Sequence, residues 1–313
     1  MIVVLVGPTA VGKSGLAIAL AEHLGAGGRP AEIVNADSML LYRGMDIGTA
    51  KPTPAERARV RHHLVDVLDV TETSTVAEFQ TLARAAIEDC LTRGVVPVVV
   101  GGSALYVRAV VDEFRFPGTD PDVRARLDAE LAERGPAALH ERLAAVDPGA
   151  AAAILPGNGR RIVRALEVIE LTGEPFTASL PAHRYALPDV RQLGLDTDRT
   201  TLDSRIADRV DRMWADGLVE EVRGLLDRGL REGRTASRAL GYAQVLDHLD
   251  GRTSEAEARE LTVTGTRKFA RRQGSWFRRD PRISWLGGPG DDPDTLLDRA
   301  ADVLAAPGPA LAD

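Results

Sequence analysis

One short segment, Gly-Pro-Thr-Ala-Val-Gly-Lys-Ser, constrains the fold of this chain more than any other part of it. The segment follows an apolar run at residues 2–6 and precedes a helix-like run at residues 16–21. This order of strand, glycine-rich loop and helix is the context in which the pattern G-x-x-x-x-G-K-[ST] forms a phosphate-binding loop. The residues expected to surround the phosphates are Gly7, Pro8, Thr9, Ala10, Val11, Gly12, Lys13 and Ser14.

The chemistry expected of this loop follows from its backbone and from its last two side chains. Backbone N–H groups would point inward toward an anion, and the positive end of the following helix would add to the attraction. Lys13 would neutralise phosphate oxygens, and the Ser14 hydroxyl would bind Mg²⁺. The alternative is a glycine-rich turn that binds nothing, but the loop, the lysine, the hydroxyl and the flanking runs all favour a polyphosphate site. The loop identifies neither the polyphosphate nor the reaction.

Strand-like segments alternate with helical ones in the first part of the chain. They are short and rich in β-branched residues, and they cover residues 2–6, 31–35, 63–67, 95–100 and 191–196, with a further candidate at 283–286. Such alternation predicts an α/β fold, namely a P-loop NTPase-like parallel sheet flanked by helices. Ligands of such sheets bind at the carboxyl ends of the strands. The segments expected to meet there are Gly7–Ser14, Asn35–Ser38, Asp66 and Gly101–Ser103.

A different pattern begins after Phe116, where helical segments follow one another without a convincing strand. Asp120 followed by Pro121 is typical of a helix start. We therefore predict an all-helical insertion between two parts of the sheet domain. The predicted organisation is residues 1–116 as the first part of the core, 117–188 as the insertion, 189–290 as the completion of the core with a basic helical region, and 291–313 as a C-terminal helix and a disordered tail.

Composition argues against several classes of protein. The longest apolar runs have the length of a strand, and the first residues lack the basic segment and cleavage site of a secretion signal. The single cysteine, Cys90, cannot form an internal disulfide. These features predict a cytoplasmic protein without a membrane partner. Zinc-binding patterns are absent from the sequence, and the adjacent His62 and His63 would point to opposite faces of a strand.

The charge of the chain is unevenly distributed. The net charge is −7, yet residues 267–282 hold seven basic side chains and one acidic one, +6 in all, which leaves −13 on the rest. Within this basic stripe Arg271 and Arg272 share a helix face with two further basic residues, and aromatic residues lie between them. Basic and aromatic side chains together favour contact with a nucleic acid. The alternative is that the aromatic residues pack inward while the arginines pair with acidic neighbours.

Several other residues have more than one interpretation from the sequence alone. Asp37 follows the second strand, where it is a helix cap, a metal-linked residue or a general base. Lys51, in a long glycine-rich loop, either reaches a phosphate or is solvated. Arg160 and Arg164 share a helix face, which suits phosphate contacts and a solvated surface alike. The pair Gly101–Gly102 indicates either a close approach to the backbone or a tight turn.

Longer motifs follow the phosphate loop in order along the chain. The most specific is Gly-Met-Asp-Ile-Gly-Thr-Ala-Lys-Pro at residues 44–52. The others are Asp37-Ser38, His62-His63-Leu64-Val65-Asp66, Val100-Gly101-Gly102-Ser103, Arg164-Ala165-Leu166-Glu167-Val168, Ala239-Leu240-Gly241-Tyr242 and Arg271-Arg272-Gln273. On these motifs, nearly all of residues 1–287 resembles the bacterial tRNA dimethylallyltransferases, the tRNA isopentenyltransferase family.

The resemblance implies a reaction and a partner. A dimethylallyl group would pass from dimethylallyl diphosphate to N6 of adenosine 37, next to the anticodon of tRNAs that read UNN codons. The helical insertion would bind the anticodon stem-loop, Mg²⁺ would be the cofactor, and we expect a monomer. Leu40 departs from the family pattern, in which Gln is common at this position.

The resemblance also implies residue roles. Asp37 would hydrogen-bond the adenine N6 and take its proton, Ser14 would hold Mg²⁺, and Arg223 would reach the diphosphate. Together these three residues, Asp37, Ser14 and Arg223, form the expected catalytic set. The residues expected to contact tRNA are Asp37, Ser38, Met39, Leu40, Ser103, Arg124, Arg160, Arg161, Arg164, Arg238, Gly241, Tyr242, Arg271 and Arg272.

Three other functions are compatible with part of the sequence. An isopentenyltransferase acting on free adenine nucleotides would need neither the helical insertion nor the basic stripe. A small-molecule P-loop kinase would need an arginine-bearing lid over ATP, and it would leave the motif at residues 44–52 unexplained. A non-catalytic, nucleotide-binding RNA chaperone would tolerate the loss of Asp37.

Overall fold

The structure, a computed structural model of the 313-residue chain, describes residues 1–114, 116–176, 183–287 and 291–306. The chain divides into two compact units. The first joins residues 1–112 to residues 185–313, and the second consists of residues 113–184, close to the insertion predicted at 117–188. Among the described residues, no helix combines the length and the apolar character needed to cross a membrane.

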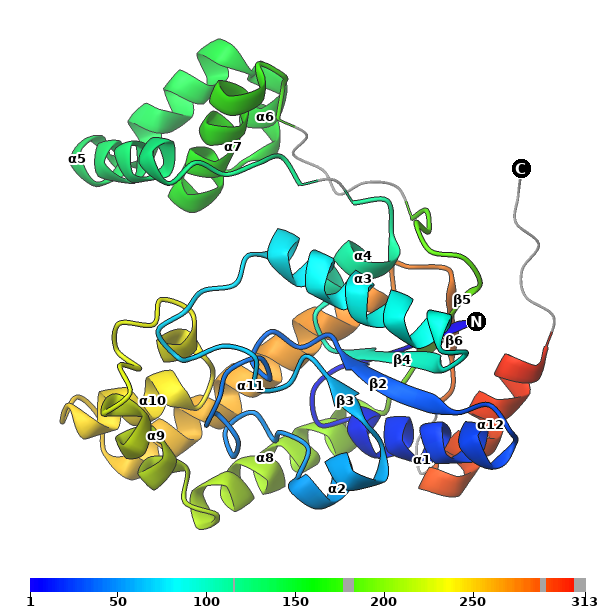
Figure 1. Cartoon of the computed structure of the whole chain (residues 1–313). Coiled ribbons are helices and arrows are strands. Elements are labelled where there is room, and N and C mark those ends of the chain that lie inside the picture. The colour runs from blue at the N-terminus through cyan, green and yellow to red at the C-terminus, as the bar shows by residue number, and fades with distance from the viewer. Residues whose placement is uncertain (115, 177–182, 288–290, 307–313) are drawn as a thin grey trace. The chain divides into compact units, whose positions relative to one another are not determined.

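The first unit is built on a six-stranded sheet in which every pair of neighbouring strands is parallel (Figure 1). The strands are β1 (Ile2–Val6), β2 (Ala31–Asn35), β3 (His62–His63), β4 (Val96–Gly101), β5 (Val190–Gly194) and β6 (Ile283–Trp285). Their order across the sheet is β3-β2-β4-β1-β5-β6. This arrangement confirms the predicted parallel α/β fold.

The third strand differs from its prediction. The sequence predicted a strand over residues 63–67, but β3 ends at His63. Leu64 and Asp66 have φ angles of 61° and 59°, which lie outside the extended region of the backbone. The side-chain amide of Asn35 donates a hydrogen bond to the carbonyl of Leu64 (2.9 Å). The chain therefore turns away from the sheet directly after His63.

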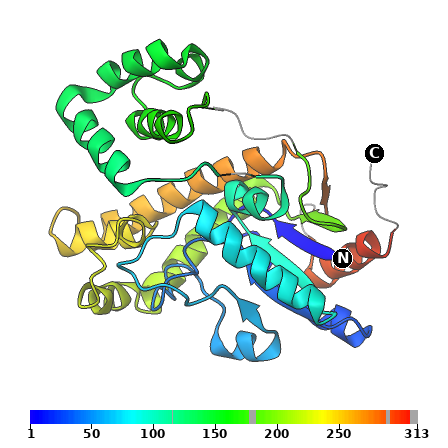
Figure 2. The ribbon, with the colours of Figure 1, turned by 45° about the horizontal axis from the view of Figure 1, so that its top comes forward.

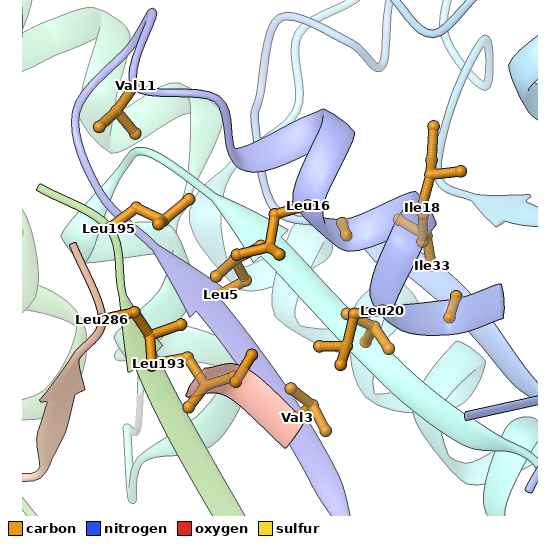
Figure 3. Packing of buried hydrophobic residues seen from close by; sticks show 14 of the residues in the cluster. Val3, Leu5, Val11, Leu16, Ile18, Leu20, Ile33, Leu193, Leu195 and Leu286 are labelled. Carbon is orange, nitrogen blue, oxygen red and sulfur yellow. The ribbon is translucent and has the colours of Figure 1, made fainter. Parts of the chain in front are cut away.

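Helices cover both faces of the sheet, which explains why the central strands are apolar over their whole length. Those of the first unit are α1 (Lys13–Ala26), α2 (Pro54–Arg59), α3 (Val76–Thr92), α4 (Ala104–Val111), α8 (Arg199–Ala215), α9 (Leu218–Leu226), the 3₁₀ turn η1 (Ala236–Arg238), α10 (Tyr242–Leu249), α11 (Glu255–Phe277) and α12 (Pro293–Ala305). Val3 and Leu5 of β1 pack into the core under α1 (Figure 3). Ile2, Val4 and Val6 pack on the opposite face, toward α3 and α4. Most of the tail predicted to be disordered, residues 307–313, lies outside the described residues.

A further apolar core joins α8, α9 and α10 to the long loop after β2. Tyr42 and Met45 of that loop are almost fully buried, and they belong to the same cluster as Leu218, Val222 and Tyr242. Because apolar side chains at its start are buried against three helices, this glycine-rich loop is a packed part of the fold.

The second unit contains helices only, among its described residues, as the sequence predicted. They are α5 (Pro121–Val146), α6 (Pro148–Ala153) and α7 (Gly159–Thr172). The Asp120 carboxylate caps α5 by accepting hydrogen bonds from the N–H groups of Asp122 (2.9 Å) and Val123 (3.1 Å). Gly135 has a φ angle of 76° and precedes Pro136, so α5 bends there (Figure 2). Buried leucine, isoleucine, valine and alanine side chains of the three helices form one core.

Candidate active site

The phosphate loop connects β1 to α1 and borders a cavity of about 1120 Å³. Gly12 has a φ angle of 106°, a left-handed conformation that glycine adopts without strain, and α1 begins at the next residue. The Lys13 ammonium donates a hydrogen bond across the loop to the carbonyl of Pro8 (2.6 Å). Of the eight residues predicted to surround phosphates, Thr9 to Ser14 line the cavity, whereas Gly7 and Pro8 do not.

Other strand ends reach the same cavity, as the topology of a parallel sheet requires. Its lining includes Asn35 at the end of β2 and Asp37 after it, Gly101 at the end of β4 and Gly102 after it, and Asp196 after β5. The predicted meeting of the segments after β1, β2 and β4 is therefore confirmed. Asp66, which was expected to join them, is not part of the lining.

Asp37 lies in a turn after β2 and is half-buried. One carboxylate oxygen, Oδ1, accepts a hydrogen bond from the N–H of Met39 (2.9 Å). The N–H of Asp37 donates to the side-chain oxygen of Asn35, and the carbonyl of Asp37 accepts from the Asn35 amide nitrogen. No helix follows, so the interpretation of Asp37 as a helix cap is wrong. Among the described residues, Oδ2 has no hydrogen-bond partner and remains available to a ligand.

Lys13 carries a perturbed ammonium group. Burial lowers the pKa of Lys13 to about 8, while the Asp37 carboxylate opposes this shift and the positive charge of Arg209 adds to it. The ammonium therefore lacks a compensating ion pair that would fully offset its desolvation. A polyanion in the cavity would supply that missing charge.

Arg209 is the second cation at the loop, and the sequence analysis missed it. It projects from α8, where one guanidinium nitrogen donates a hydrogen bond to the Thr9 hydroxyl (3.3 Å) and another to the carbonyl of Thr49 (3.1 Å). Burial lowers the pKa of Arg209 as well. Arg205, one turn earlier on α8, lines the same cavity. The signal available in the sequence was this pair of arginines at i and i+4, on the helix directly after a strand whose carboxyl end faces the loop.

Arg223, which was expected to reach the diphosphate, lies elsewhere. It is exposed on α9, and its guanidinium forms an ion pair with Glu220 one turn away (3.0 Å). Its side chain does not line the cavity. The structure therefore does not place Arg223 at the phosphate loop, because the side chain is exposed on α9 and pairs with Glu220 there.

Lys51 lines the cavity, but it is not solvated and its ammonium is already bonded within the protein. Its ammonium is almost fully buried and bonds Asp46 (2.6 Å), Asp66 (2.5 Å) and the carbonyl of Tyr42 (2.7 Å). Three acceptors saturate the three donors of an ammonium group. Asp66 also pairs with Arg57 (2.7 Å). In place of a phosphate ligand at Lys51 and a site residue at Asp66, the structure has a network of ion pairs around the buried Lys51 ammonium, which closes the loop at residues 46–51.

Gln273 is a second residue that sequence reasoning did not place in the site. Its side-chain oxygen accepts a hydrogen bond from the N–H of Thr9 (2.8 Å). It approaches Gly102 so closely that a Cβ there would lie 2.5 Å from the Gln273 amide nitrogen. The expectation of a close approach at Gly101–Gly102 is confirmed, and the neighbour of Gly102 is Gln273. The side chain ties α11 to the phosphate loop directly after the pair Arg271–Arg272.

Three of the arginines expected to contact tRNA are exposed on the first unit. Arg271 and Arg272 lie on α11, and Arg238 ends η1. Of the aromatic residues in the basic stripe, Trp276 is 43% exposed while Phe277 is 3% exposed. Each of the two interpretations of the stripe therefore describes part of it.

Other residues expected to contact tRNA are less accessible. Ser38 and Met39 are half-buried in the turn after Asp37, Leu40 lines the cavity, and Ser103 lies at the start of α4. Gly241 and Tyr242 are buried. A tRNA contact by the Tyr242 side chain does not fit its position, because the phenol lies inside the core and donates a hydrogen bond to Glu221 (2.5 Å).

In the second unit, the expected tRNA-binding arginines fall into two groups. Arg124 and Arg164 both pair with the carboxylate of Glu167, which is fully buried. Arg160 and Arg161 are exposed at the start of α7. The interaction with Glu167 fixes α5 to α7, so Arg124 and Arg164 have a structural role whether or not they also touch a ligand.

The two adjacent histidines have separate hydrogen-bond partners. His62 bonds the carbonyl of Val60 (2.7 Å), and His63 bonds Glu32 (2.6 Å) near the thiol of Cys90. Burial raises the pKa of the Cys90 thiol to about 11, and Arg93 already holds Glu32 through two hydrogen bonds. Glu32, His63, Cys90 and Arg93 therefore form one polar cluster beside β3.

The parallel sheet, the phosphate loop and the two cations beside it define a P-loop-like protein whose loop has the chemistry of a phosphate site. The family model described as IPP transferase matches residues 40–280. The chain belongs to the IPP transferase family, and it is therefore an enzyme of the transferase class.

Similar proteins agree over nearly the whole chain. A curated relative from Kineococcus radiotolerans, named tRNA dimethylallyltransferase, is 66% identical over 97% of this chain and 96% of its own length. One from Thermobifida fusca with the same name is 66% identical over 96% and 92%. The tRNA isopentenylpyrophosphate transferase of Bacillus halodurans has a TM-score of 0.69, with 39% identity over 97% of this chain and 96% of that one. A eukaryotic dimethylallyltransferase acting on tRNA has a TM-score of 0.79, with 26% identity over 96% and 76%.

Proposed function

We propose that this protein transfers the dimethylallyl group of dimethylallyl diphosphate to N6 of adenosine 37, beside the anticodon of tRNAs that read UNN codons. The products would be N6-isopentenyladenosine and diphosphate. The proposal depends on one observation: positively and negatively charged side chains line the same cavity. Lys13 and Arg209 lie at the phosphate loop, and the Asp37 carboxylate is close enough to affect the pKa of Lys13. The names of the relatives agree with this reaction.

The cationic side of the cavity suits the departure of a diphosphate. An allylic carbon–oxygen bond ionises readily once the charge that develops on the leaving oxygens is stabilised. Lys13, Arg209 and the N–H groups of the loop supply that stabilisation without reorganisation, because the fold already holds them. Arg209 takes the role that the sequence resemblance gave to Arg223.

The anionic side suits the acceptor. The exocyclic amine of adenine is a weak nucleophile, so holding it in line with the allylic carbon and accepting its proton both lower the barrier. Asp37 has one carboxylate oxygen fixed by a backbone N–H and the other available, which is the geometry of an oriented base. The target base would leave the stack of the anticodon loop to reach the cavity, at modest cost because the loop is single-stranded.

Magnesium fits the same end of the cavity. Ser14 lies in the first turn of α1, its side chain is exposed to the cavity, and a hydroxyl next to phosphate oxygens is a usual ligand of Mg²⁺. The ion would neutralise charge on the diphosphate. The exposed arginines Arg271 and Arg272 of α11, and Arg160 and Arg161 of α7, are the side chains we assign to the tRNA backbone.

The test is a transfer assay with defined acceptors. The protein is incubated with Mg²⁺, dimethylallyl diphosphate and an unmodified tRNA that has adenosine at positions 36 and 37, and the digested tRNA is analysed by mass spectrometry. We expect N6-isopentenyladenosine from tRNA and no prenylated product from AMP. Prenylated AMP alone would favour a nucleotide acceptor, and no transfer together with ATP-dependent phosphorylation of a small molecule would favour a kinase.

The matched variant for this assay is Asp37→Asn. It keeps the shape of the side chain and removes the proton acceptor, so we expect turnover to fall by about 10²–10⁴-fold. Binding of tRNA, measured by filter retention, should change little. Full activity of Asp37→Asn would refute the role of Asp37 as the base.

A further inference from the structure

Glu221 occupies an unusual position between α9 and the loop after β2. Its carboxylate oxygen Oε2 accepts hydrogen bonds from the N–H groups of Asp46 (3.0 Å) and Ile47 (2.7 Å). The other oxygen, Oε1, accepts from the N–H of Gly48 (3.3 Å) and from the Tyr242 hydroxyl (2.5 Å). One carboxylate therefore accepts hydrogen bonds from three consecutive backbone N–H groups and from one phenol. An exposed glutamate usually forms at most a weak ion pair, so four fixed donors are unusual.

The surroundings of this carboxylate are built to keep those donors in place. Tyr242 is fully buried, and burial together with the negative charge of Glu221 raises the pKa of the Tyr242 phenol well above its ordinary value. The phenol therefore stays protonated and donates. A Cβ at Gly48 would lie 2.4 Å from the Tyr242 ring, so only glycine lets the backbone approach the ring and the carboxylate together.

The segment held by Glu221 leads directly to the cation of the site. Residues 46–48 continue into Thr49, whose carbonyl accepts a hydrogen bond from Arg209 (3.1 Å). The same guanidinium donates to the Thr9 hydroxyl in the phosphate loop (3.3 Å). The position of the Thr49 carbonyl therefore sets one of the two hydrogen bonds that orient Arg209.

We propose that Glu221 is a positioning residue that orients the guanidinium of Arg209 through the backbone of residues 46–49. The proposal rests on the function proposed above only in giving Arg209 a diphosphate to bind. Glu221 itself does not line the cavity, so it acts through Arg209 and not on a substrate.

The diagnostic substitution is Glu221→Gln. It keeps the size of the side chain but turns one of the two oxygens into an NH₂ group. An amide nitrogen in place of Oε2 faces two backbone N–H groups, whereas in place of Oε1 it faces the N–H of Gly48 while the Tyr242 hydroxyl can turn and accept. In either orientation at least one backbone donor loses its acceptor, so we expect the loop to move and the Thr49 carbonyl to move with it. Glu220→Gln is the matched control, because Glu220 is the preceding residue, is exposed and pairs only with Arg223 in the described structure.

The first readout needs no ligand. In protein labelled with ¹⁵N-arginine, the Nε–Hε resonance of Arg209 is identified by its loss in Arg209→Lys. We expect it to shift or broaden in Glu221→Gln and to stay in place in Glu220→Gln. An unchanged Arg209 resonance in folded Glu221→Gln would overturn the proposal.

The second readout is the affinity for inorganic diphosphate with Mg²⁺, measured by calorimetry in a double-mutant cycle. Glu221→Gln should weaken binding by about tenfold in the natural background and by less than about twofold in the Arg209→Ala background, because the effect passes through the missing guanidinium. Equal weakening in both backgrounds would mean a general loosening of the site and would contradict the inference.

If Glu221→Gln unfolds, Tyr242→Phe replaces it. This variant removes one donor and keeps three, so the expected effect is smaller. If the unsubstituted protein binds no diphosphate, the proposed function is refuted. The positioning role would still stand if the Arg209 resonance responds to Glu221→Gln.

Discussion

Raising the pH from 7 to 9 should weaken the binding of an allylic diphosphate, because Lys13 loses its proton in that range. Burial lowers the pKa of Lys13 to about 8 in the free protein, against an ordinary value of 10.5. A bound diphosphate places several negative charges beside the ammonium and restores its proton. Binding is therefore coupled to proton uptake, and the coupling is strongest above pH 8.

The size of the effect follows from that pKa. If the ammonium is fully protonated in the complex, the apparent affinity falls by a factor of 1 + 10^(pH − pKa), which is about 1.1 at pH 7 and about 11 at pH 9 for a pKa of about 8. The expected loss is therefore about tenfold across these two units. The ligand contributes little, since the last ionisation of a phosphate ester lies near a pKa of about 6.

The assay is calorimetric titration with a non-ionising thiolodiphosphate analogue of dimethylallyl diphosphate, in buffers of different ionisation enthalpy. At pH 9 we expect uptake of nearly one proton per ligand, and at pH 7 almost none. Lys13→Arg is the control, because a guanidinium keeps its charge throughout this range. Constant affinity from pH 7 to 9 without proton uptake would refute the argument that Lys13 is desolvated and unpaired in the free protein.

Three further outcomes are expected. Arg209→Ala should lower the rate of prenyl transfer by about 10²–10³-fold, whereas Arg223→Ala should change it by less than about twofold; equal losses in initial-rate assays would contradict the assignment. Lys13→Met should raise the melting temperature at pH 7, since a folded-state pKa below the ordinary 10.5 means that charging Lys13 opposes folding at low pH; calorimetry should show the gain shrinking as the pH rises from about 8 toward 10.5. Glu167→Ala should destabilise the helical unit by about 2–3 kcal/mol in urea unfolding, because two arginines lose a buried partner, and an unchanged midpoint would exclude this role.

The parallel sheet was largely predictable, because its strands are local apolar runs that alternate with helices, although this alternation does not give the order of the strands. The failure at residues 63–67 shows the limit of that reasoning. The segment has the composition of a strand, but a side-chain amide from Asn35 captures the carbonyl of Leu64 and the backbone turns. Such a capture depends on a residue far away in the sequence, so no local pattern could indicate it.

The same distinction separates the predictable part of the site from the rest. The phosphate loop and Asp37 follow strands directly, so the topology alone brings them together. Arg209 and Gln273 arrive from helices about two hundred residues or more along the chain from Thr9, which each of them contacts. The family motif predicted an arginine at the diphosphate and assigned this role to Arg223, because the sequence does not show which side chains of α8 and α9 are directed toward the phosphate loop.

The formal charge of the basic stripe overstates the positive charge that it can offer to a ligand. The basic stripe at residues 267–282 has a formal charge of +6, but acidic side chains of the protein neutralise part of it. Arg267 lies against Asp203, Arg278 pairs with Asp196 (2.6 Å), and Arg282 pairs with Asp112 (2.8 Å). Arg271 and Arg272 have no ion pair among the described residues and are exposed. A phosphate backbone can respond only to charge that the protein has not already neutralised. The same holds in the cavity, where the informative cation is Lys13, with its lowered pKa, and not Lys51, whose donors are all used.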